Sequence, residues 1–244
     1  MKKMFFLAGA SAAVAMTAAS SADIQGCFYH GYWQSGEEFG GNAVEAYVVD
    51  MYMWTDSADD ALLNVYNASI NNSLGTVAYY QSLTASGWAP NFQGGVFDTT
   101  ASRYLDSFVS AGGRDSDGNA SLDANGNLIQ MGGNGTGIDP DFGGNDAQMP
   151  GDSAGWYNSN PNNPIGAGYL NSNLPGALGQ QLSIFIGRFT LDAEFDLSGE
   201  LSVTWNEGIG TPGAQETFAI NEIPAPGALA LLGLSGLAAR RRRG

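Results

Sequence analysis

The strongest constraint on folding lies in the middle of the chain, where residues 112–179 are crowded with Gly, Asn, Asp and Pro. A stretch of this composition buries too little apolar surface to build regular structure of its own, so we expect long ordered loops or partly disordered segments. Phe142, Trp156, Tyr157 and Tyr169 are spaced through it, and we expect them to pin the stretch onto a core formed elsewhere. Alternatively, these aromatic residues are exposed and stack on sugar rings, with Trp156 and Tyr157 as the ligand-binding pair.

The regions on either side of this insert carry strand signals. Runs of β-branched and aromatic residues that end at turn clusters occupy 44–54, 62–66, 76–81, 182–191 and 200–205. Phe195 and Leu197 suggest a short further strand before the last of these runs. Long amphipathic helices are not evident. The pattern predicts an all-β fold, a single antiparallel β-sandwich of jelly-roll or cohesin-like type over residues 23–221, with the insert at about 112–179.

The amino end is typical of a secretory signal peptide over residues 1–22. Met1-Lys2-Lys3 is positively charged, the stretch from Met4 to Met16 is apolar, and small residues precede a cleavage site between Ala22 and Asp23. We therefore expect signal peptidase and the secretion machinery to export the mature chain.

The carboxyl end, residues 222–244, has three parts in a fixed order. Pro224-Ala225-Pro226 comes first, an uncharged stretch from Gly227 to Ala239 follows, and Arg240, Arg241, Arg242 and Arg243 come last. As a helix the apolar part would be about 20 Å long, which is short of the ~30 Å hydrocarbon core of a bilayer. The arginines would stay on the cytoplasmic side and leave the preceding chain outside. We expect this helix to lie apart from the folded domain.

Together these two ends resemble those of PEP-CTERM proteins. In that family an exosortase-type sorting enzyme acts on the tail, and here Ala225 stands where the family motif has glutamate. The resemblance implies transient anchoring in the inner membrane, cutting near Pro224 to Pro226, and a final place at the cell envelope surface or in the extracellular matrix. An ordinary carboxyl-terminal membrane anchor is the alternative.

The charge balance excludes one class of partner. Between Asp23 and Pro224 the only basic residues are Arg103, Arg114 and Arg188, against all 24 acidic residues of the chain. A domain this acidic repels nucleic acid and anionic membranes. The acidic surface is better suited to binding divalent cations or to staying soluble at high salt concentration.

Cysteine contributes no staple to the fold, because Cys27 is the only one in the chain and cannot form an intramolecular disulfide. Two interpretations remain open for it: a buried or unpaired thiol, or the lipid-bearing residue of a lipoprotein.

A candidate calcium loop lies at the start of the insert. Oxygen-bearing side chains alternate there, with Asp115, Asp117, Asn119, Asp123 and Asn125 as the possible ligands. The EF-hand pattern fails, since position six counted from Asp115 is Ala120 and position twelve is Gly126. The loop is therefore either a calcium site of another kind or a turn rich in Asp, Asn and Gly.

Catalytic signals are weak. Catalysis of the Ser-His-Asp or Cys-His kind would have to use the single histidine, His30, and nothing in the sequence completes such a site. The sequence therefore predicts an exported structural protein without catalysis and without a required cofactor. The alternatives are a calcium-dependent polysaccharide-binding module and a secreted glycosidase, which would need two carboxylates about 5–10 Å apart in a cleft.

Overall fold

The computed structural model describes residues 23–85, 87–92, 94–114, 119–130, 135–142, 153–160, 162, 164–172, 174–175, 179, 181–208, 211 and 213–223. The predicted signal peptide up to Ala22 and the predicted sorting tail from Pro224 onward, with the helix expected at Gly227 to Ala239, lie outside these residues. No helix in the described ranges is long and apolar enough to cross a membrane.

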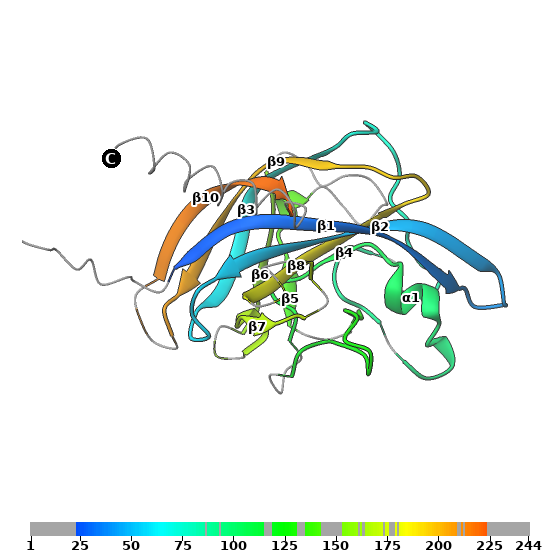
Figure 1. Ribbon diagram of the computed structural model, residues 1–244, viewed down its shortest axis with the longest axis horizontal. Helices are drawn as coiled ribbons and strands as arrows, with labels where there is room; N and C mark the ends of the chain where they lie inside the picture. The colour runs from blue at the N-terminus through cyan, green and yellow to red at the C-terminus, as the bar shows by residue number, and fades with distance from the viewer. Residues whose placement is uncertain are drawn as a thin grey trace, which may run out of the picture.

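The described chain is built mainly from strands (Figure 1). The strands are β1 (Ile24–Glu37), β2 (Ala43–Thr55), β3 (Ala61–Asn72), β4 (Phe108–Val109), β5 (Thr136–Ile138), β6 (Ala154–Asn158), β7 (Tyr169–Leu170), β8 (Leu182–Leu191), β9 (Leu197–Asn206) and β10 (Gly213–Glu222). The helical elements are α1 (Thr100–Tyr104) and the 3₁₀ turns η1 (Gly95–Phe97), η2 (Pro140–Phe142) and η3 (Pro164–Gly166).

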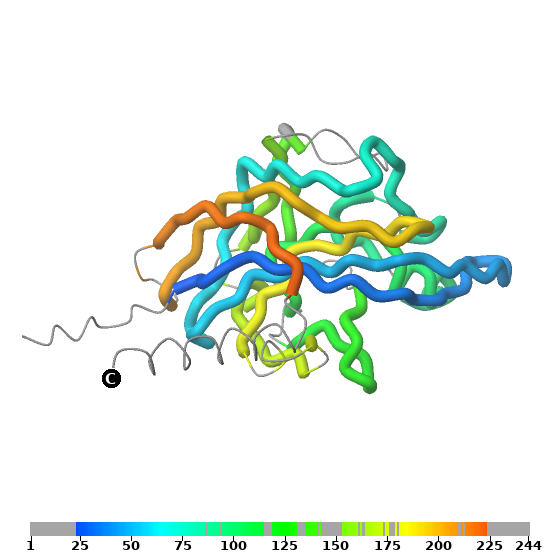
Figure 2. The backbone as a smooth tube through the Cα atoms, turned by 45° about the horizontal axis from the view of Figure 1, so that its top comes forward, coloured from blue at the N-terminus to red at the C-terminus, as the bar shows by residue number. Residues whose placement is uncertain are grey.

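All the strands belong to one mixed sheet, in the order β4-β8-β2-β1-β10-β9-β3-β6-β5, with β7 paired to β8. Every pair is antiparallel except β1 with β10, which run parallel and place Cys27 beside Ile220. This pair joins two antiparallel halves, and the sheet curves until it nearly closes into a barrel (Figure 2). The predicted all-β class is confirmed. A single sandwich of two separate antiparallel sheets is not shown, because the first and last strands join the halves into one sheet.

The main core lies inside this curve. It combines Met51 and Met53 of β2 and Ile186 of β8 with Val203 and Trp205 of β9, so both halves contribute to it. Alternation along the strands turns these side chains to one face of the sheet.

The prediction of a strand at 76–81 is wrong, because this segment forms no strand. It is held by its side chains, since the Tyr79 ring is buried and packs edge-to-face against Trp88 and Phe189. The backbone N–H of Tyr80 also donates to the carbonyl of Thr190 at 2.8 Å. Strand propensity here is used for aromatic packing and not for pairing.

The outer face of β8, β2 and β1 is covered as well. At one end, Ala101 and Leu105 of the α1 region pack on Ala46 and Val48 of β2. Thr99 caps α1 by accepting a hydrogen bond from the backbone N–H of Ser102. At the other end, insert residues that include Leu128, Tyr169 and Leu174 pack on Tyr52 and Phe185. β8 and most of β2 are thus buried on both faces, which is unusual for an antiparallel sheet.

Candidate functional site

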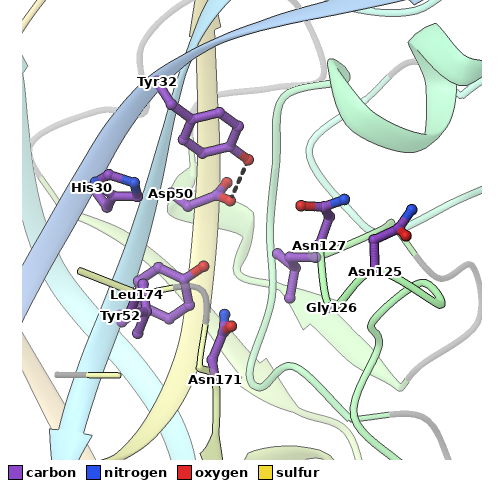
Figure 3. A pocket seen from close by; sticks show the side chains of 10 residues that line it. His30, Tyr32, Asp50, Tyr52, Asn125, Gly126, Asn127, Asn171 and Leu174 are labelled. Carbon is purple, nitrogen blue, oxygen red and sulfur yellow. Dashed lines mark hydrogen bonds between the residues drawn. The ribbon is translucent and has the colours of Figure 1, made fainter. Parts of the chain in front are cut away.

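A cavity lies on the outer face of β1 and β2, where the insert crosses the sheet (Figure 3). Its volume is about 440 Å³. Its lining residues come from β1, from β2, from the turn at 125–128 and from the segment at 171–174, and they are His30, Tyr32, Asp50, Tyr52, Asn125, Gly126, Asn127, Leu128, Asn171 and Leu174.

An ion pair between Arg188 and Asp50 anchors the sheet side of this cavity. Arg188 Nε lies 2.7 Å from Asp50 Oδ1, and Nη2 lies 2.9 Å from Oδ2. The Tyr32 hydroxyl donates to Asp50 Oδ2 at 2.9 Å. The two ionic side chains are 0% and 2% exposed. Burial alone would lower the pKa of Arg188, but the neighbouring Asp50 carboxylate outweighs it and the pKa is raised.

Arg188 reaches the outer face because of a bulge in β8. Met51 pairs with Gly187, but the next residue of β2, Tyr52, pairs with Phe185, so the register shifts by one residue. Ile186 and Phe189 both point into the main core, while Phe185 and Arg188 share the outer face. With uninterrupted alternation Arg188 would have followed Ile184 and Ile186 into the apolar core.

Arg188 also connects the two sides of the cavity. Its Nη2 donates to the carbonyl of Leu128 at 3.2 Å, and its Nη1 donates to the carbonyl of Arg103 at 3.3 Å. Leu128 belongs to the turn that forms the opposite wall. One guanidinium therefore holds both the sheet and the insert.

His30 lines the cavity from β1, directly opposite Asp50 in the β1–β2 register. Its ring stacks on that of Tyr32, with centroids 5.5 Å apart. Burial lowers the pKa of His30, although the charges of Asp50 and Glu222 oppose this effect. The imidazole is therefore neutral near pH 7 and offers one donor and one acceptor.

The turn on the insert side is built around Asp123. Its Oδ1 accepts from the backbone N–H groups of Asn125 and Asn127, at 2.8 and 2.9 Å, and its Oδ2 accepts from the Tyr104 hydroxyl and the Asn127 amide. Burial would raise the pKa of Asp123, but these hydrogen bonds outweigh it and lower the pKa to about 2. The Asp123 carboxylate thus stabilises the turn in which it lies by accepting these hydrogen bonds.

This geometry bears on the predicted calcium loop. Asp115 and Asp117 lie outside the described residues, Asn119 is exposed, and Asn125 lines the cavity. Both oxygens of Asp123 already accept hydrogen bonds from the turn. Within the described part of the chain, no three His, Cys, Asp or Glu residues gather as a metal site would require.

The two residues predicted to stack on sugar rings, Trp156 and Tyr157, point to opposite faces of the sheet. Trp156 of β6 is 1% exposed, and its Nε1 donates to the carbonyl of Ser110 at 3.0 Å. Tyr157, the next residue, points to the other face and is 42% exposed. Phe142 and Tyr169 are buried like Trp156, so these three residues pin the insert onto the sheet as expected.

Two further buried acids meet at Ser82, away from the cavity. Glu38 accepts from the Ser82 hydroxyl at 3.3 Å, and Asp106 accepts from the Ser82 backbone N–H at 2.7 Å. Burial raises the pKa of Asp106 well above its ordinary value, against hydrogen bonds from Ser82 and Gln130. Glu38 is 7% and Asp106 0% exposed, so both carboxyl groups are buried.

Sequence reasoning missed most of the cavity. Tyr32, Tyr52 and Asn171 carried no signal, and Asn125 was selected for another reason. Asp50 and Arg188 could have been found, because a charged residue in the middle of an otherwise apolar strand is rarely buried unless it is paired.

Comparison of the chain with protein-family models, with curated proteins and with solved structures finds no match in any of the three.

Proposed function

We propose that the chain is an exported protein that an exosortase-type enzyme sorts to the cell surface or extracellular matrix, where its β domain has a structural role without catalysis. The observation that carries this proposal is the pair of end segments in the sequence, a signal peptide over 1–22 and a PEP-CTERM-like tail over 222–244 with the Pro224-Ala225-Pro226 motif. The strands fit between the signal peptide and the Pro224-Ala225-Pro226 motif, since β1 begins at Ile24 and β10 ends at Glu222, one residue inside the predicted tail.

The chemistry of the cavity supports a role without turnover. Asp50 is the only carboxylate among its described lining residues, and Arg188 and Tyr32 already engage it. General acid–base hydrolysis of a glycoside needs two carboxyl groups at the bond that is cut.

Intact mass spectrometry tests the sorting proposal. The protein is recovered from the surface and medium of its own host and compared with that from a strain lacking the sorting enzyme. The expected species begins at Asp23 and ends near Pro224, and it appears only when the enzyme is present. A chain that still ends in Arg243-Gly244 in both strains would show that the tail is a plain membrane anchor.

A second candidate function is binding of a small ligand by the displayed domain, and the preformed cavity favours it. The cavity is held on both sides by Arg188, and its described lining combines amides, hydroxyls and aromatic rings. Small-molecule sites have this character, with volumes of about 300–1,000 Å³.

A further inference from the structure

We propose that the cavity between β1–β2 and the turn at 125–128 binds a neutral saccharide unit, and that it does so without calcium. This specifies the ligand class for the second candidate function and rests on it. Sorting of the chain is not required, because saccharide binding can be measured on the purified protein.

The charge state of the cavity selects a neutral ligand. Asp50 is the only acidic and His30 the only basic side chain among its described lining residues. The charge of Asp50 is balanced by Arg188, which is fully buried behind it. His30 is uncharged near pH 7 because burial lowers its pKa. A charged ligand would lose its hydration shell here without gaining a counter-charge.

The polar groups suit a ligand rich in hydroxyls. Figure 3 shows the Tyr52 hydroxyl of β2 and the Asn171 amide turned toward the same space, with Asn127 on the opposite wall. An amide and a phenol each both donate and accept hydrogen bonds, as does every sugar hydroxyl. Burial keeps the pKa of Tyr52 well above its ordinary value, so its proton is retained.

Apolar surface lies beside these groups. The stacked rings of His30 and Tyr32 line the β1 side, and Leu174 lines another part of the wall. A sugar ring carries C–H groups on its faces and hydroxyls at its edge, so it can meet an aromatic surface and amides at the same time. A cavity that lacked the aromatic surface would not select a sugar ring in this way.

The cavity is also rigid before a ligand arrives. Arg188 fixes Asp50 on the sheet side and the Leu128 carbonyl on the insert side, and Asp123 holds the turn with four hydrogen bonds. A site that is already ordered loses little conformational entropy on binding. Calcium is not needed for this order, because Asp123 is satisfied by the turn itself.

The test is isothermal titration calorimetry of the purified protein. The ligands are glucose, galactose, mannose and N-acetylglucosamine, each as the free sugar and as short oligomers. The uronic acid and the amino sugar of each ring serve as its charged counterparts. We expect at least one neutral sugar to bind in the presence of EDTA. The matching charged sugars should bind at least tenfold more weakly.

Two variants locate the binding site. Tyr52→Phe removes one hydroxyl and keeps the buried ring, and Asn171→Ala removes one amide. Each should weaken binding about threefold to tenfold, the effect of one hydrogen bond. Asn71→Ala, at an exposed position of β3 in the other half of the sheet, is the matched control and should change nothing.

Four results would overturn the proposal: no neutral sugar binds at millimolar concentration, EDTA abolishes binding, the charged sugars bind as tightly, or Tyr52→Phe and Asn171→Ala both leave binding unchanged. Circular dichroism shows whether each variant is folded. None of these results affects the mass-spectrometric test of sorting, so the two proposals succeed or fail separately.

Discussion

Arg188 and Asp50 lie directly opposite each other on β8 and β2 and form an ion pair that is closed off from solvent. Two charges taken out of water are stable only when their hydrogen-bonding capacity is met. Here Asp50 accepts from Arg188 and Tyr32, and Arg188 also donates to the carbonyls of Leu128 and Arg103. The pair therefore connects the sheet with two segments that cover it.

Replacing Asp50 by Asn should destabilise the protein strongly. The substitution keeps the shape of the side chain but leaves Arg188 buried without a counter-charge, which costs about 3–5 kcal/mol. Urea unfolding followed by tryptophan fluorescence measures the loss. Asp98→Asn is the matched control, because the Asp98–Arg103 pair is partly exposed and should contribute about 0–1 kcal/mol. Similar small losses for both variants would contradict this account.

Replacing Gly199 by Ala should be much more damaging than replacing Gly75. Both residues have positive φ, +120° and +81°, which costs an L-residue about 1–2 kcal/mol. At Gly199 an added Cβ would also overlap the carbonyl oxygen of Ser69 on β3, whereas at Gly75 nothing lies within 4 Å. Overpacking adds a further loss of about 1–3 kcal/mol. Equal unfolding midpoints for the two variants would show that β3 and β9 are not so closely paired.

The stability of the domain should fall as the pH drops below about 6.5, the ordinary pKa of histidine. The folded state lowers the pKa of His30 by burial, despite Asp50 and Glu222, so it binds fewer protons than the unfolded chain in this range. As His30 is the only histidine, its proton NMR titration is unambiguous. A measured pKa at or above 6.5 would be inconsistent with the structure. His30→Gln should flatten the dependence of the unfolding midpoint on pH between 7.5 and 5.

Cys27 should resist thiol reagents until the protein unfolds. It is 0% exposed near the start of β1, beside Met53 and Ile220, and burial raises the pKa of its thiol. Reaction depends on the thiolate and on access, and both are suppressed here. Labelling with a maleimide in buffer and in 6 M guanidinium, read by mass spectrometry, should give modification only in the denaturant. Rapid labelling of the native protein would show that thiol reagents reach Cys27 in the folded state.

The strands that the sequence predicted well are those buried on both faces. Residues 44–54 and 182–191 have few polar positions and became β2 and β8 with little change at their ends. β1 was missed because Gly26, His30 and Gly31 interrupt its apolar pattern. β10 was missed because most of its side chains are exposed. Each of these strands pairs with its neighbour along the chain, β1 with β2 and β10 with β9, and the two also pair with each other across almost the whole length of the domain. Local propensity does not report such pairing.

The candidate site shows the same limit. The charges of Asp50 and Arg188 stand out within their strands, but their pairing depends on the register between β2 and β8 and on the bulge near Gly187. The segment that contains Asp123 and Asn125 was predicted to be either a calcium loop or a turn rich in Asp, Asn and Gly. Asn125 and Asn127 line the same cavity as His30 and Tyr52 only because the insert folds back over the sheet.

The parallel pairing of the first and last strands places the end of the domain close to the cavity. The backbone N–H of Ile223 donates to the carbonyl of Tyr29, and its side chain packs in the same cluster as Tyr52 and Leu174. If the chain is attached at its carboxyl end, a mechanical load between that attachment and a ligand in the cavity would pass through these few contacts. The strands from β9 to β5, which form the other part of the sheet, would lie outside this path.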